Sequence, residues 1–274
     1  MRKCRNFLIN LSGALPTRIQ GRVWTYHLYP ISYLELSQQS SLFALEDQLK
    51  DRLIFGSYPN IFSIENREEK VEYLMNLSRS YLYKDVLEAV SIKNSSKIRD
   101  LLRLLAYQIG SEVSYSELAS HLEMSKDTVA RYIDLLEKSY VIFRLSGFSR
   151  NLRKEITKMD KIYFYDLGIR NSLIETFKSV DKRDDVGKLW ENFLIVERMK
   201  TMAYQNQFLS HYFWRVYTGA EIDLIEEKEG SLMGFEMKWK NKLMSAPASW
   251  KENYPDAGFK TINRQNYLGF VLNQ

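Results

Sequence analysis

Hydrophobic and polar positions recur with two different periods along the chain, and together they predict helices mixed with strands. A helical period of about 3.6 residues marks the segments 33–55 (one or two helices), 65–88 and 186–204. Alternation, or short apolar runs rich in β-forming residues, marks strands at 6–11, 23–29, 161–167, 211–217, 220–227 and 232–239. The last thirty residues are weakly patterned. The expected fold class is mixed α/β in several domains.

Residues 114–145 carry the most regular pattern and predict a winged helix. Ser116 is expected to cap a first short helix and Ser125 a second, and a turn of three to four residues joins them. Alternating apolar residues from Val141 to Leu145 then supply a wing strand. In such a module the start of the second helix can enter the major groove of DNA. The outward residues there, and hence the predicted DNA contacts, are Lys126, Thr128 and Arg131, with Asp127 beside them.

Charge sets a limit on that DNA contact. The chain has 39 Lys and Arg against 34 Asp and Glu, a net charge of +5. Because phosphate contacts dominate DNA affinity, this modest excess predicts weak binding, and a protein-binding role for the module stays open. The basic stretch 150–161 could cover a phosphate backbone, and a solvated connector is the alternative.

A second group of residues, between 191 and 238, predicts metal chemistry. Glu236 and Lys238 are two apart on one strand and share a face. A hairpin through Gly230 would bring Asp223 of the preceding strand close to Glu236. Two converging carboxylates can hold Mg²⁺ through hard oxygen ligands, so Asp223 and Glu236 are the predicted metal ligands. Lys238 would orient water or neutralise phosphate.

Glu191 is a further candidate because it falls on the apolar face of the helix 186–204, as does Glu197. Carboxylates on a buried face are costly without a partner. The alternative is a buried carboxylate satisfied by an arginine or by the backbone. With Glu191 upstream, Asp223 followed by Glu236-Met-Lys238 resembles the PD-(D/E)xK, restriction-endonuclease-like fold. That resemblance implies a nuclease-like domain with Asp223, Glu236, Lys238 and Glu191 as its catalytic set.

Motifs spread over nearly the whole chain carry a wider resemblance. They are Leu8–Gly13, Gly21-Arg22, His27–Tyr33, Phe55–Pro59 and Lys161–Gly168. The chain thereby resembles the C-terminal part of a prokaryotic AAA-type P-loop ATPase family, whose members carry a C-terminal domain of unknown function with a winged helix and a nuclease-like fold. The resemblance implies three parts: an ATPase remnant with helices (1–92), a winged helix (93–148) and a nuclease-like α/β domain (149–274).

The chain departs from that family at the nucleotide site. No Gly-x-x-x-x-Gly-Lys-[Ser/Thr] loop is present, so the cradle that holds the phosphates is missing. We expect a truncated member with no nucleotide-binding residues, which neither binds nor hydrolyses ATP by itself. Arg22 either acts on nucleotide held by another subunit or forms a structural salt bridge.

Three functions therefore compete. The leading one is DNA association with Mg²⁺-dependent phosphodiester cleavage. The second is a catalytically inactive DNA- or protein-binding module, and the third a non-hydrolysing partner of an intact ATPase subunit or of further copies of this chain. A single cysteine, Cys4, excludes an intramolecular disulfide and a thiolate zinc site. With no apolar run of 18 residues and no cleavage site after the N-terminal segment, we expect a cytoplasmic protein without a membrane partner.

Overall fold

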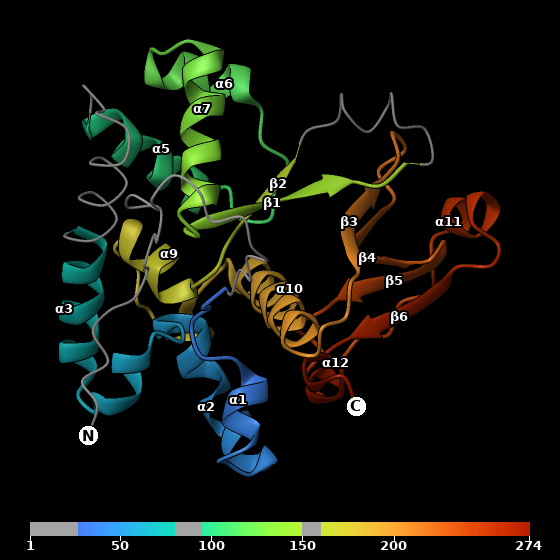
Figure 1. Cartoon of the computed structure of the whole chain (residues 1–274), viewed down its shortest axis with the longest axis horizontal. Coiled ribbons are helices and arrows are strands. Elements are labelled where there is room, and N and C mark those ends of the chain that lie inside the picture. The colour runs from blue at the N-terminus through green and yellow to red at the C-terminus, as the bar shows by residue number, and fades with distance from the viewer. Residues whose placement is uncertain (1–26, 80–94, 150–159) are drawn as a thin grey trace, which may run out of the picture.

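Six strands form one mixed sheet in the computed structural model, which describes residues 27–79, 95–149 and 160–274 (Figure 1). The strands are β1 (Ile142–Gly147), β2 (Lys161–Phe164), β3 (Ser210–Arg215), β4 (Glu221–Lys228), β5 (Ser231–Met237) and β6 (Gly258–Ile262). Their order across the sheet is β2-β1-β3-β4-β5-β6. The pairs β1–β3 and β5–β6 are parallel and the other three are antiparallel. This arrangement confirms the mixed α/β class.

The N-terminal helices begin at side-chain caps. The described ones are α1 (Tyr33–Ser37), α2 (Leu42–Phe55), the 3₁₀ turn η1 (Pro59–Ser63) and α3 (Arg67–Leu77). Ser32 and Glu35 form a reciprocal capping box on α1, and Ser41 and Asn66 cap α2 and α3. These caps satisfy N–H groups that the first turn of a helix leaves without partners. The pattern of the segment 33–55 predicted one or two helices, and the structure has two, α1 and α2.

The last three described helices before β1 include the predicted helix-turn-helix pair. They are α5 (Ser95–Tyr107), α6 (Tyr115–Leu122) and α7 (Lys126–Lys138). Ser125 caps α7 as expected, by accepting a hydrogen bond of 3.1 Å from the backbone of Thr128. The expected cap of α6 was wrong: Ser114, not Ser116, accepts the capping bond, from Glu117 N. The helix begins earlier than expected because Tyr115 packs against the core.

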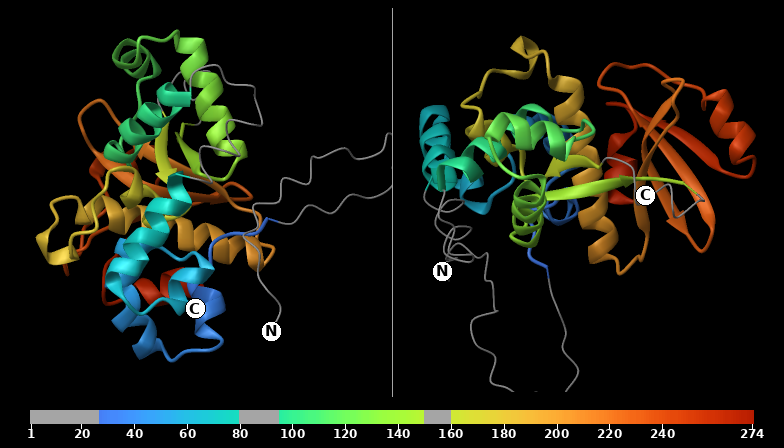
Figure 2. Two further views of the ribbon diagram at one scale, coloured as in Figure 1. Left: turned by 90° about the vertical axis from the view of Figure 1, so that its left-hand side faces the viewer. Right: turned by 90° about the horizontal axis from the view of Figure 1, so that it is seen from above.

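The remaining helices surround the sheet. They are α9 (Leu167–Leu173), the 3₁₀ turn η3 (Val180–Lys182), α10 (Val186–Tyr204), α11 (Ala248–Asn253) and α12 (Tyr267–Leu272). The long α10 matches the predicted span 186–204 and is buried along most of its length. One apolar cluster joins α10 and α12 to Phe213, Phe235 and Met237, and a second joins α11 to Trp214 and Ile222. The helices α10 and α12 lie on one side of the sheet and α11 lies on the other (Figures 1 and 2).

Several predicted elements end elsewhere or lie outside the described residues. The strand 6–11 and most of the strand 23–29 lie outside them, and residues 27–29 are not in a strand. Only the first part of the predicted helix 65–88 is described, as α3. The strand 161–167 ends at Phe164, because Asp166 caps α9 by accepting from Ile169 N at 3.0 Å. The elements α9, α11, β6 and α12 were not expected from the sequence.

Three of the motifs that carry the family resemblance meet in one place. The backbone N–H of Ile31 donates to Ser57 O at 2.9 Å, and Ser57 N donates to the carboxylate of Asp166 at 2.7 Å. A Cβ at Gly168 would lie 2.2 Å from the carbonyl oxygen of Phe55. The motifs 27–33, 55–59 and 161–168 are therefore packed backbone to backbone, and small residues are needed where they touch.

The predicted boundary at residue 148 separates strands that share one sheet. β1 pairs with β2 over four residues and then meets β3 at Ser146 and Gly147. The expected wing strand thus also links the α5–α7 unit to the sheet that carries β4 and β5. The three-part division stays a prediction. No helix in the described ranges is both long and apolar enough to cross a membrane.

Candidate functional site

A tight hairpin sets the position of the predicted carboxylates. Glu229 and Gly230 form its two-residue turn, both with positive φ (51° and 83°), as hairpin turns of this length prefer. From that turn the pairing runs to Leu224 opposite Phe235. The next step along both strands brings Asp223 beside Glu236.

A β-bulge interrupts β4 at this same point. Tyr212 pairs with Ile225 but Trp214 pairs with Ile222, so β4 has one extra residue against β3. Ile222 therefore packs in the α11 cluster while Leu224 packs in the α10 cluster. From simple strand alternation, Ile222 and Leu224, which flank Asp223, are both predicted to lie on the face away from it; this prediction is wrong, because the bulge places them in different clusters. Bulges are common beside active sites, where they redirect a side chain.

Asp223 is buried at this bulge. The residue is only 8% exposed, and its Oδ2 accepts a hydrogen bond of 2.7 Å from the backbone N–H of Met237. Burial, followed by the charges of Glu191 and Glu236, raises the pKa of Asp223 to about 8. The carboxyl group therefore holds a proton near neutral pH when no cation is close enough to offset those charges.

Glu236 and Lys238 form an ion pair with each other. Burial alone would lower the pKa of Lys238, but the hydrogen bond to Glu236 and the charges of Asp223 and Glu236 outweigh burial and raise it. The lysine side chain is about one-third exposed (36%). Its ammonium group is therefore charged and reachable from solvent at the end of β5.

Glu191, on α10, is held by three groups that the sequence did not single out. Tyr163 donates a hydrogen bond of 2.5 Å to its Oε1. Lys161 Nζ lies 3.4 Å from Oε1, and Lys188 Nζ lies 3.7 Å from Oε2. Lys161 is 2% exposed and also pairs with Glu221. The only local signal for Lys161 is a lysine at the start of an otherwise apolar strand.

Glu221 extends this network toward solvent. Arg215 Nε lies 4.0 Å from Glu221, and Arg215 Nη1 lies 3.1 Å from Glu112. Burial would raise the pKa of Glu221, but the charge of Lys161 and its hydrogen bond lower it. Lysine and arginine thus neutralise the glutamates of the group, whereas the hydrogen bond found for Asp223 in the described ranges comes from the backbone.

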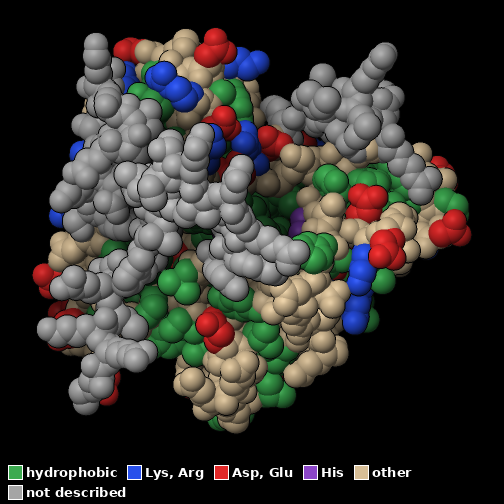
Figure 3. Space-filling model, in the orientation of Figure 1, with side chains coloured by type: hydrophobic (Ala, Val, Ile, Leu, Met, Phe, Trp, Pro, Cys, Tyr) green, Lys and Arg blue, Asp and Glu red, His purple; other side chains and the backbone are tan. Residues whose placement is uncertain are grey.

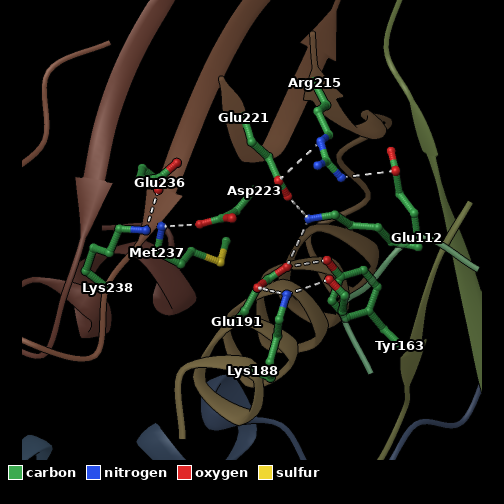
Figure 4. Close-up of polar contacts among 12 residues, drawn as sticks. Glu112, Tyr163, Lys188, Glu191, Arg215, Glu221, Asp223, Glu236, Met237 and Lys238 are labelled. Atoms are coloured by element: carbon green, nitrogen blue, oxygen red, sulfur yellow. Dashed lines mark hydrogen bonds and ion pairs between the residues drawn. The ribbon is translucent and has the colours of Figure 1, made fainter. Parts of the chain in front are cut away.

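Figure 4 shows Asp223 in the middle of the group, with Glu236 and Lys238 on one side and Glu191 and Glu221 on the other. The structure brings all four predicted residues into one polar cluster. Asp223 forms no direct hydrogen bond with Glu191 or Glu236 within this described cluster, although their charges act on its pKa. Among the described residues, no three His, Cys, Asp or Glu side chains are grouped to hold a metal ion.

The donor chemistry nevertheless suits a hard cation. Mg²⁺ is usually held by one or two carboxylates and keeps several waters. Asp223 offers one oxygen without a hydrogen-bond partner in the described ranges, and Glu236 offers a carboxylate whose present partner is a partly exposed lysine. These two carboxylates have the oxygen donors that Mg²⁺ prefers, and the metal site itself stays a prediction.

Glu197, the other carboxylate on the buried face of α10, lies outside this cluster. It accepts a hydrogen bond of 2.6 Å from Tyr33 N and one of 2.8 Å from Lys200. The Tyr33 backbone and the buried Lys200 therefore satisfy the Glu197 carboxylate. The alternative given for such a carboxylate named the backbone or an arginine, and here a lysine takes the place of the arginine.

The predicted DNA contacts lie at the start of α7. Lys126 and Arg131 are exposed, and the hydroxyl of Thr128 lies 2.8 Å from Ser125 Oγ. Thr128 is therefore engaged in the helix cap, whereas Lys126, Asp127 and Arg131 all face solvent. Lys and Arg are interspersed with Asp and Glu over the α6–α7 end of the molecule (Figure 3), and DNA binding by this module stays a prediction.

Two families of unknown function match this chain. Residues 46–180 match a domain of unknown function (DUF8612), and residues 186–266 match another (DUF4143). The second match spans α10 through β6 and so contains Asp223, Glu236, Lys238 and Glu191. No solved structure matches the chain significantly.

The curated relatives are uncharacterized proteins. One from Mycobacterium tuberculosis is 28% identical over 232 residues, which are 84% of this chain and 50% of the relative. One from Methanocaldococcus jannaschii is 24% identical over 251 residues (85% and 54%), and another from that organism is 33% identical over 132 residues (47% and 27%). The chain spans about half the length of the first of these relatives. Their names state no activity, so the ATPase and nuclease relationships stay predictions.

Proposed function

We propose that this protein associates with DNA and that the unit of α10 and β3–β6 hydrolyses phosphodiester bonds with the help of Mg²⁺. The observation that carries the proposal is the buried carboxyl group of Asp223, which the backbone of Met237 holds near Glu236 and Lys238. A carboxylate buried near two others is costly to ionise. A cation bound beside Asp223 would offset the free-energy cost of ionising it.

Asp223 and Glu236 would hold the ion. Bound there, Mg²⁺ would lower the pKa of a coordinated water and stabilise negative charge on the phosphate. Lys238, released from Glu236, would contact a phosphate oxygen with its ammonium group. Glu191 would accept a hydrogen bond from water on the α10 side, because Tyr163 and Lys161 fix its carboxylate in place.

DNA would approach along exposed cations. Lys126 and Arg131 lie in the first half of α7, and Lys238, Lys240 and Lys242 follow one another past the end of β5. Each phosphate contact contributes roughly 0.9 to the slope of log affinity against log salt. With few such contacts, binding to duplex DNA should be weak and salt-sensitive.

The ion pairs of the cluster favour a second candidate, a nuclease-like unit that binds DNA without cleaving it. Lys161 and Lys188 form ion pairs with Glu191, and Lys238 forms one with Glu236. Lysines in these positions can substitute for the charge of a metal ion. In that case the fold would survive and the chemistry would be lost, because fold does not determine function.

Two measurements on the full chain separate the candidates. The first is thermal unfolding with and without MgCl₂ or MnCl₂, since a ligand that binds the native state alone raises its stability. The second is incubation with supercoiled, single-stranded and branched DNA. Both are repeated for Asp223→Asn and for Glu227→Gln, a matched removal of one carboxylate charge at the other end of β4.

The nuclease proposal expects metal-dependent stabilisation and nicking in the parent and in Glu227→Gln, and neither in Asp223→Asn. Retarded but intact DNA together with metal-independent unfolding would support the binding module instead. If DNA is neither retarded nor cut at low salt, both candidates fail and α5–α7 is better understood as a protein-binding unit.

A further inference from the structure

A hollow of about 470 Å³ lies between α3, α5 and α9, apart from the acidic cluster. These three helices are neighbours, with α3 and α5 both packed against α9 (Figures 1 and 2). The volume falls within the range of small-molecule sites, roughly 300–1,000 Å³. None of its lining residues in the described part of the chain belongs to the site discussed above.

Positive charge dominates the described part of the lining. Arg79 follows the end of α3, and Arg99 and Arg103 are one turn apart on α5, whereas Glu175, after α9, is the one acidic lining residue in the described ranges. Like charges four residues apart on a helix repel each other. Among the described residues, no ion pair is formed by Arg79, by Arg103 or by Glu175.

We propose that this hollow binds a small phosphorylated molecule. A guanidinium group presents a planar fork of donors that matches two phosphate oxygens at once. Several arginines facing one concave space therefore recognise a compact multivalent anion better than a single carboxylate. An anion would also relieve the repulsion between Arg99 and Arg103.

The other lining residues narrow the ligand class. None of the lining residues in the described ranges is aromatic, so this part of the lining offers no ring on which a nucleic-acid base could stack. The hydroxyls of Ser78 and Ser172 donate to carbonyl groups of their own segments, Met75 O at 3.0 Å and Ile169 O at 2.7 Å. Recognition therefore falls to the arginines, and it is directed at phosphate rather than at a base.

This inference does not depend on the proposed nuclease. It concerns other helices and other residues, and Asp223→Asn should leave it unchanged. Duplex DNA is the competing source of phosphate, but the hollow is concave and bounded by three helices, which suits a small molecule better than a duplex.

The test is isothermal titration of the full chain with pyrophosphate and, separately, with inorganic phosphate, at low salt. Arg79→Ala and Arg103→Ala should each weaken pyrophosphate binding at least about tenfold, because each removes charge-assisted hydrogen bonds. Arg103→Lys keeps the positive charge but lacks the planar guanidinium donors, so it should weaken pyrophosphate binding less than Arg103→Ala does. Lys178→Ala, which removes an exposed cation outside the hollow, serves as the charge-matched control, and circular dichroism verifies that each variant is folded.

Three results would overturn the proposal. One is the absence of pyrophosphate binding to the folded parent. Another is an equal loss in Lys178→Ala, which would mean that net charge alone attracts the anion. The third is a loss of duplex DNA retardation in Arg79→Ala and Arg103→Ala without any pyrophosphate binding, which would assign these arginines to a DNA surface.

Discussion

Asp223 accepts a hydrogen bond of 2.7 Å from the backbone N–H of Met237, the residue that separates Glu236 from Lys238. The bond ties the bulged part of β4 to the end of β5. It uses the backbone of residue 237, so the position of Asp223 depends on the strand and not on the methionine side chain. Its carboxyl group is thereby fixed near Glu191 and Glu236, where its negative charge is unfavourable.

Asp223→Asn should stabilise the metal-free protein at neutral pH, by about 1–3 kcal/mol. In the unfolded chain Asp223 loses its proton near its ordinary pKa of 3.8, whereas in the fold it keeps the proton up to about pH 8. The stability of the parent therefore falls as pH rises from about 4 to about 8, and an amide, which does not titrate, avoids this loss.

Urea unfolding of both proteins across pH 4–8, in the presence of EDTA, measures the effect. The two curves should converge at the acid end and separate as pH rises. Curves that stay parallel over the whole range would mean that Asp223 titrates normally in the fold.

Lys161→Met should destabilise the protein by about 3–5 kcal/mol, the usual cost of removing one partner from a buried ion pair. Lys161 is 2% exposed and pairs with both Glu191 and Glu221, so its loss leaves buried negative charge. Thermal or urea unfolding provides the measurement.

Lys188→Met is the matched control, because Lys188 also approaches Glu191 but its side chain is 43% exposed. An exposed pair contributes roughly 0–1 kcal/mol. Adding Glu191→Gln to Lys161→Met should restore part of the lost stability. No recovery in this double variant would indicate that Lys161 acts through its contact with the Phe213 ring and not through its ion pair with Glu191.

The parts of the fold that the sequence predicted are those with a clear period: the strands 211–217, 220–227 and 232–239 correspond to β3, β4 and β5. The helix 186–204 shows a helical period over nineteen residues and has the predicted bounds. By contrast, α12 is six residues long and mostly buried, and β6 has five residues with no regular alternation of burial. Segments this short that also lack a regular alternation reveal no period, and their structure is decided by tertiary packing.

The candidate site was predictable only in part, for a related reason. Glu236 and Lys238 are two apart on a strand, and Glu191 is an acid on an apolar helix face, so local spacing was enough to select them. Lys161 and Tyr163 reach Glu191 from a strand about 30 residues earlier. Such a contact depends on the β2–β1–β3 order of the sheet, which no local pattern contains.

Asp185→Asn should destabilise the protein by about 2 kcal/mol at pH 7. Burial alone would raise the pKa of Asp185, but hydrogen bonds from Arg183 and the charge of Arg170 lower it to about 2. This stability is fully present above the ordinary pKa of 3.8 and is lost as pH falls toward 2. Unfolding by urea at pH 7 and near pH 2.5 should show a smaller difference between variant and parent at the lower pH.

Lys126→Ala and Arg131→Ala should each weaken binding to duplex DNA and lower the slope of log affinity against log salt by roughly 0.9. Both residues are exposed on α7. Lys138→Ala, at the opposite end of the same helix, is the control and should leave the slope unchanged. Fluorescence anisotropy at several salt concentrations gives the slopes, and equal slopes in all three variants would remove α7 from the DNA interface.

Gly56→Ala should cost several kcal/mol, because two effects coincide at this residue. Gly56 has φ of 70° and ψ of −156°, a region that other residues occupy only at a cost of about 1–3 kcal/mol. An added Cβ would also lie 2.1 Å from Asp166 Oδ1, and so would displace the carboxylate that accepts from Ser57 N and caps α9.

Gly219 isolates the backbone effect, since its φ is 92° but an added Cβ would have no neighbouring atom within 4 Å in the described part of the chain. Gly219→Ala should therefore cost only about 1–3 kcal/mol, and Gly56→Ala should lower the thermal midpoint considerably further. Equal midpoints would mean that Asp166 moves aside without loss, and that the junction of the segments 55–59 and 161–168 does not depend on its hydrogen bonds.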